Sequence, residues 1–238
     1  MPHSFMGKVQ FDADLLTNDD RFQWEQSVAA TLNKVWESYT GRNLLDVMGQ
    51  SHKIVKIVPF YKDKVNASAK ARSPKDAYYP ERPLRRADNG HLYAGSGTGT
   101  GRGSDVRLNF TPWRYPRTVA PSKLIHEMTH AAEMQRGVIF MNTVHSACFD
   151  TVAEFDAIVV ENIYRSETHL SGENLFIRKD HHGTHPLHGN RMLPQEGELG
   201  ARLDSFRARM PQLTQALAQV RVAFNPLRPG NPAYGAGR

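Results

Sequence analysis

The pattern of apolar and polar positions predicts amphipathic helices in three parts of the chain. Apolar side chains recur at helical spacing over residues 21–39, 151–167 and 200–224. A glycine at position 41 suits the end of the first of these helices, because glycine readily adopts the left-handed conformation that follows a helix. Residues 44–48 have the pattern of a short further helix.

Two shorter segments have the pattern of β-strands. Residues 53–60 are dense in β-branched side chains, and residues 106–110 alternate apolar with polar before Pro112. We therefore expect an α+β fold with a small, mostly antiparallel sheet. If the 106–110 strand crosses the mouth of a binding site, its edge could hold an extended peptide by strand addition.

Two segments have the composition of irregular structure. Residues 62–104 are rich in Pro, Ser, Gly and basic residues, which predicts a long flexible loop that could serve as a substrate flap. Residues 225–238 are rich in Pro and Gly and predict a disordered tail. The length of the chain then fits a single domain over residues 1–224.

The chemistry of the sequence is concentrated in the HExxH motif formed by His126, Glu127 and His130. Side chains four positions apart lie one above the other on a helix, so both imidazoles can reach one metal ion. Glu127 lies about 100° round the helix, where it can act as a general base without binding the metal. Pro121 suits the first turn of such a helix, and apolar residues around the motif predict burial.

A catalytic zinc ion usually has three protein ligands and one open position, so the motif needs a third ligand from elsewhere. The extended metzincin pattern is absent, because Glu133 and Arg136 stand where it requires glycine and histidine. Glu154 is the preferred candidate, because Ala157 lets its helix pack closely against the motif helix. The alternatives are Asp150, Asp156, Glu161 or a histidine from residues 181–188, and Glu161 could equally be a solvated charge.

Catalysis of acyl transfer also needs a donor to the oxyanion. Tyr164 and His182 are the candidates, the latter from a histidine-rich stretch at residues 180–188. The same stretch could instead be a polar surface loop or supply the missing metal ligand.

Composition and charge restrict the partners of the protein. The net charge of +6 comes from scattered basic residues without the aromatic interleaving of single-strand binders, so we do not expect nucleic-acid binding. No apolar run approaches the ~20 residues of a membrane span. The first residues lack the apolar centre of a signal peptide, which predicts a cytosolic protein or export by another route. The single cysteine, Cys148, allows no internal disulfide and is expected to be a buried apolar residue.

The motif helix resembles that of the NleD-like effector zinc metallopeptidases of Gram-negative bacteria. The likeness covers roughly residues 20–168, with a strand and proline before the motif and a helix that begins at Glu154 after it. The acidic pair usual at the third-ligand position is here Ala153-Glu154. The resemblance implies a gluzincin-type, zincin-like protease, made in the bacterial cytoplasm and secreted to act in a target cell. Such a protein would have a secretion-system chaperone or an immunity protein as partner.

These observations predict a Zn²⁺-dependent endopeptidase acting on a protein or peptide, with His126, His130 and Glu154 as ligands and Glu127 as base. The alternatives are an amidase-type metallohydrolase and a binding protein with a structural zinc site. The single cysteine and the intact Glu127 argue against a structural site, because structural zinc sites are often rich in cysteine.

Overall fold

The computed structural model describes residues 4–5, 7–14, 16–60, 67–80, 85–86, 92–93, 97–142, 151–168 and 196–229 of the 238 residues. The described helices are α1 (Asn18–Glu37), α2 (Tyr39–Gly49), α3 (Pro74–Ala77), α4 (Ala120–Arg136), α5 (Val152–Glu167), α6 (Glu196–Arg209) and α7 (Pro211–Ala218), with a 3-10 turn at Pro112–Arg114. The described strands are β1 (Ser4–Phe5), β2 (Val9–Phe11), β3 (Val55–Val58), β4 (Ser68–Ala71), β5 (Tyr78–Pro80), β6 (Arg85–Arg86), β7 (Leu92–Tyr93), β8 (Gly97–Gly99) and β9 (Val106–Asn109). The predicted α+β class is confirmed.

The main sheet has the strand order β1-β2-β3-β9-β4 and is mixed. β3 pairs in parallel with both β2 and β9, whereas β1 and β4 pair antiparallel with their neighbours. The prediction of a mostly antiparallel sheet is therefore wrong. The short strand β2 lies in a segment for which the sequence predicted no strand, and its parallel pairing with β3 requires the helical crossover formed by α1 and α2.

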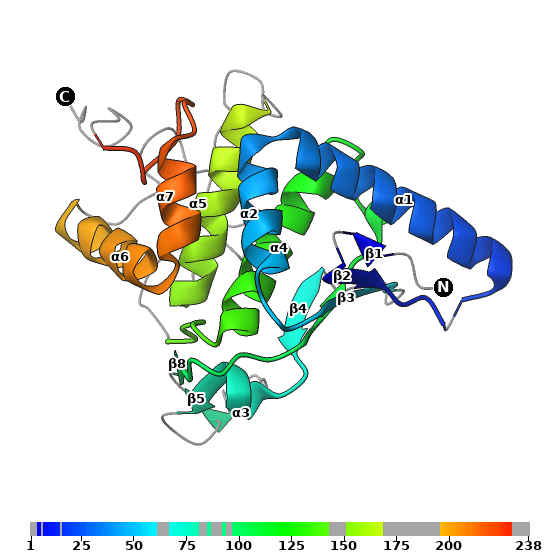
Figure 1. Ribbon diagram of the computed structural model, residues 1–238, viewed down its shortest axis with the longest axis horizontal. Helices are drawn as coiled ribbons and strands as arrows, with labels where there is room; N and C mark the ends of the chain where they lie inside the picture. Colours follow the sequence, from blue (N-terminus) through cyan, green and yellow to red (C-terminus); the bar gives the residue numbers. More distant parts are fainter. Residues whose placement is uncertain are drawn as a thin grey trace.

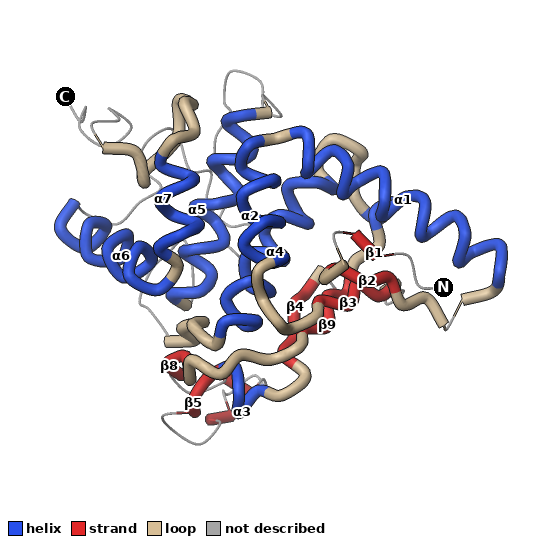
Figure 2. Tube along the Cα trace, viewed as in Figure 1, coloured by secondary structure: helices blue, strands red, loops and turns tan. Residues whose placement is uncertain are grey.

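Helices α1, α2 and α4 lie on the inner face of this sheet, α5 to α7 lie beyond them, and α3 lies apart, beside β5 (Figures 1 and 2). The inward side chains of β2, β3 and β9 are buried and share one apolar core with Trp24 of α1 and Leu124 of α4. Helix α4 contacts β4 and β9 on one side and packs along α5 on the other. The motif helix therefore lies at the centre of the molecule, between the sheet and α5.

The glycine-rich part of the predicted flexible loop is packed against the end of the motif helix. Gly137 ends α4 in the left-handed conformation with φ of 65°, and its carbonyl accepts a hydrogen bond from the Gly101 N–H at 2.8 Å. A Cβ atom at Gly103 would lie 1.9 Å from the carbonyl oxygen of Gln135. Residues 67–80 also form regular structure, including β4 and α3. Gly101, Gly103 and Gly137 allow the two backbones to approach closely. The prediction of a flexible loop is therefore wrong for residues 67–80 and for the glycine-rich part.

Helix ends differ from the predictions in two places. Gly41 lies inside α2, where a Cβ atom would be 1.9 Å from the carbonyl oxygen of Val35, while Ser38 caps the helix. The predicted helix over 200–224 is two helices, because Pro211 begins α7 and proline favours the first turn of a helix. Both residues stand at sharp changes of chain direction that periodicity does not reveal.

The first residues of the predicted tail are part of the folded structure. Asn225 is fully buried, and its side-chain amide donates to the carbonyls of Leu217 and Val220 at 2.8 Å each. Leu227 is also buried. Residues 225–229 are thus part of the fold, and the remainder of the predicted tail lies outside the described residues. No described helix is long and apolar enough to cross a membrane.

Candidate metal centre

The two motif histidines lie on the face of α4 that meets α5. The helix begins with Pro121 in its first turn, and both histidines are buried. Ala131 on α4 and Ala157 on α5 are also fully buried, and their small side chains let the two helices approach closely. The predicted motif helix and its packing against the 151–167 helix are both confirmed.

Glu154 projects from the first turn of α5 towards the histidines. Thr151 caps this helix, and its hydroxyl accepts a hydrogen bond from the Glu154 N–H at 3.2 Å. An N-terminal cap fixes the direction in which a helix begins, so it also fixes where the Glu154 side chain points.

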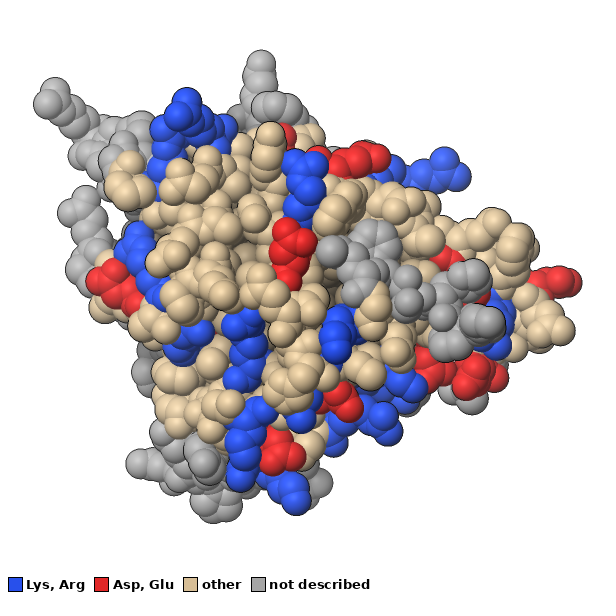
Figure 3. Space-filling view, viewed as in Figure 1, with Lys and Arg blue, Asp and Glu red and all other residues tan. Residues whose placement is uncertain are grey.

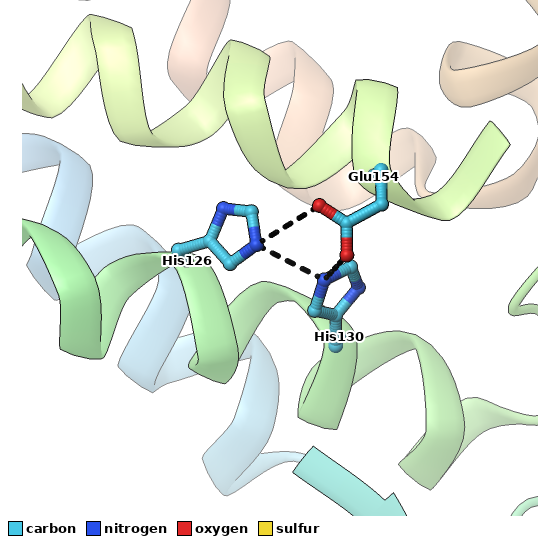
Figure 4. A group of neighbouring side chains, drawn as sticks. All are labelled: His126, His130 and Glu154. Atoms are coloured by element: carbon cyan, nitrogen blue, oxygen red, sulfur yellow. Dashed lines mark hydrogen bonds and ion pairs between the residues drawn. The ribbon is translucent and has the colours of Figure 1, made fainter. Parts of the chain in front are cut away.

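Three side chains converge on one point in Figure 4. The Nε2 atoms of His126 and His130 are 3.3 Å apart. Glu154 reaches both, with Oε2 at 3.3 Å from His126 Nε2 and Oε1 at 3.2 Å from His130 Nε2. One ligand atom from each residue lies within 4.8 Å of the others, so the group could hold a metal ion. The structure thus brings together the three residues predicted as ligands.

The other nitrogen of His126 faces a second carboxylate. Its Nδ1 atom is 3.2 Å from Oε2 of Glu161, which is fully buried two turns further along α5. Arg165 approaches the other oxygen of this carboxylate at 3.4 Å. A carboxylate at Nδ1 holds the proton there and leaves Nε2 with its lone pair towards the ligand group. The reading of Glu161 as a solvated charge is therefore wrong.

Glu127 lines the same cavity as the three candidate ligands but is not one of them. The cavity has a volume of about 180 Å³, and Glu127 is 8% exposed. The other residues that line the cavity are Ala67, Ser68, Ala69, Met134, Ile139, Met141, Thr151 and Ala153. A carboxylate that lines the cavity of the candidate ligands without being one of them is a candidate for a general base.

No family model and no curated protein matches this chain. The resemblance to the NleD-like peptidases therefore stays a prediction.

Tyr164 is not in position for its predicted role at the oxyanion. It stands ten residues after Glu154 on α5, about 15 Å away at the rise of an α-helix. Its side chain lines a different cavity, together with Glu37 and Glu167. Burial and then the charges of Glu167 and Glu37 raise the pKa of its phenol. The helical repeat carries Tyr164 too far from the ligand group.

Several other predicted residues lie outside the described part of the chain. These are His182, Asp150, Cys148 and the histidine-rich stretch at residues 180–188. Asp156 is described, but its carboxylate pairs with Arg209 and is not part of the ligand group.

Arg209 forms ion pairs with both of the helices that carry the candidate ligands. Its guanidinium is 2.8 Å from Glu133 of α4 and also pairs with Asp156 of α5. It stacks over the ring of Phe140 at 4.5 Å. Burial and the neighbouring Asp156 raise the pKa of Glu133 well above its usual range.

Replacing Arg209 is expected to destabilise the fold strongly. Arg209→Met removes the guanidinium that, among the described residues, pairs with the fully buried Glu133 and Asp156. Removing one partner from a buried ionic group costs about 3–5 kcal/mol. Chemical denaturation of the metal-free protein measures this loss. The matched control is Arg207→Met on the same helix, whose ion pair with Asp204 is exposed and is worth about 0–1 kcal/mol. Equal losses in the two variants would contradict the prediction.

Sequence reasoning considered Glu161 only as an alternative ligand or a solvated charge, although it is seven residues after Glu154 and so lies on the same helix face. It assigned no role to Arg209 or to Ala67 and Ala69. These residues left no local signal, because they reach the site only through tertiary packing.

Proposed function

We propose that the protein is a zinc-dependent endopeptidase. The observation that carries the proposal is the convergence of His126, His130 and Glu154 beside the non-ligating Glu127. Two ligand atoms about 2.0–2.1 Å from a tetrahedral zinc ion are about 3.3–3.4 Å apart. The two Nε2 atoms are 3.3 Å apart, and each has one of the two Glu154 oxygens at 3.2–3.3 Å. Two imidazoles and one carboxylate are also a known ligand set of catalytic zinc.

Zinc, when bound, would polarise a carbonyl and lower the pKa of water at the site. Glu127 would accept the proton of the attacking water and deliver it to the nitrogen of the leaving amine. Glu161 would hold His126 in one orientation and one tautomer throughout the reaction. Each of these roles belongs to a residue whose place relative to the cavity is described above.

An extended peptide is the substrate that best suits the shape of the site. The cavity is bounded by Ala67, Ser68 and Ala69 at the start of β4. Among the described strands, β4 pairs with β9 alone and is the edge of the main sheet. A peptide can add to such an edge through main-chain hydrogen bonds. The edge predicted for this purpose was that of residues 106–110, but β9 is an inner strand, so that prediction is wrong.

The experiment compares the protein with zinc, after treatment with a chelator, and after zinc has been restored. Each sample is incubated with a mixture of denatured proteins, and new peptide termini are identified by mass spectrometry. We expect new termini in the first and third samples and few in the second. Metal-dependent hydrolysis of small amides without any new protein termini would instead support an amidase. Secretion and action in a target cell, which the resemblance implies, are a separate proposal that this assay leaves aside.

A further inference from the structure

The outer face of the main sheet carries a row of cationic side chains. Lys56 of β3 stands opposite Arg107 of β9, and Arg107 stands opposite Lys70 of β4. Their neighbours along each strand point to the buried inner face, so all three point outwards. Figure 3 shows lysine and arginine side chains, interspersed with aspartate and glutamate, on the lower part of the visible face.

Like charges that lie directly opposite each other on neighbouring strands destabilise a sheet. At one end of the row the charge is offset, because Lys56 is 3.5 Å from Asp12. At the other end, neither Arg107 nor Lys70 forms an ion pair with any described residue. Arg107 has one weak contact with Asn109 at 3.4 Å. The uncompensated positive charge is therefore next to the open edge of β4.

A peptide that adds to β4 extends this row by one position. On β4, Ala69 and Ala71 pair with the buried Leu108 and Val106 and so face inwards, whereas Lys70 faces outwards. Residues directly opposite each other on paired strands point to the same face of the sheet. The peptide residue opposite Lys70 would then lie on the outer face. Its two neighbours in the peptide would point towards α4 and the candidate ligand group.

We propose that Lys70, supported by Arg107, selects peptides with Asp or Glu at the position that pairs with Lys70. This inference rests on the proposed endopeptidase function and adds a substrate class to it. An acidic side chain there would complete the row and offset its charge, whereas a basic side chain would add a fourth cation to it. Opposite-charge pairs across strands correspond to a preference of up to about fivefold.

The test uses cleavage sites from a mixture of denatured proteins, read by mass spectrometry, for the zinc-loaded protein and three variants. For the wild type we expect Asp and Glu to be enriched by up to about fivefold at one position relative to the cleaved bond. Lys70→Gln should lose this enrichment, and Lys70→Glu should replace it with enrichment of Lys and Arg. The glutamate in Lys70→Glu stands opposite Arg107, so the melting temperature should not fall.

The matched control is Lys34→Glu, which makes the same charge change on the exposed side of α1, away from β4. It should keep the wild-type cleavage profile. An unchanged profile in Lys70→Glu, or the absence of any acidic preference in the wild type, would overturn the inference while leaving the endopeptidase function intact. A zinc-loaded wild type that makes no cuts would overturn both.

Discussion

Glu127→Gln is expected to abolish nearly all peptide cleavage while zinc stays bound. Glutamine has almost the same shape but cannot accept a proton from water, and removal of a positioned general base costs about 10²–10⁴-fold in rate. Glu127 lines the cavity but lies outside the ligand group, so the metal content should not change. Initial rates on a peptide found in the cleavage assay, together with metal analysis of the same sample, measure both quantities.

The matched control is Glu37→Gln, the same chemical change at an exposed position near the end of α1. This variant should keep the full rate. A Glu127→Gln protein that retains both zinc and full activity would remove Glu127 from the mechanism. A variant that loses zinc as well would assign Glu127 to metal binding instead.

Glu154→Ala is expected to have the largest effect on metal affinity. Its carboxylate supplies one of three ligand atoms and the only negative charge among them. Loss of a residue that merely orients a ligand costs about 10–100-fold in affinity, and loss of a ligand should cost more. Competition with a chelator of known affinity, at constant pH, gives the two dissociation constants on one scale.

Glu161→Gln provides the graded comparison on the same helix. This residue faces Nδ1 of His126 and lies two turns beyond Glu154, so its replacement should weaken zinc binding by about 10–100-fold. The order of affinities should therefore be wild type, then Glu161→Gln, then Glu154→Ala. The reverse order, or parent-level affinity in Glu154→Ala, would show that the ligand assignment is wrong.

The central elements of the fold and the ligand group were predictable because their signals are local. The spacing of His126 and His130 requires only one helix, and the periodicity of residues 151–167 places Glu154 near the start of another. The paired strands β3 and β9 were likewise visible as short β-branched or alternating segments. Each of these features depends on residues within a few positions of one another.

Other features depend on contacts between distant parts of the chain. The glycines before β9 have a composition typical of flexible loops, yet they are needed for close contact with the end of α4. Which strand forms the edge of the sheet depends on the pairing of β4 with β9, nearly forty positions apart. No local pattern specifies such pairings, because they are stabilised by burial of the whole inner face.

The sequence by itself determined the motif helix and the α+β class, and it made Glu154 the preferred candidate for the third ligand. The tertiary structure alone decided that Glu161 faces His126, that Arg209 joins α4 to α5, and that β4 is the edge beside the cavity. The physical reason is the range of the interactions involved. Helical periodicity and capping act within a turn or two, whereas buried ion pairs and strand order are settled when the core forms.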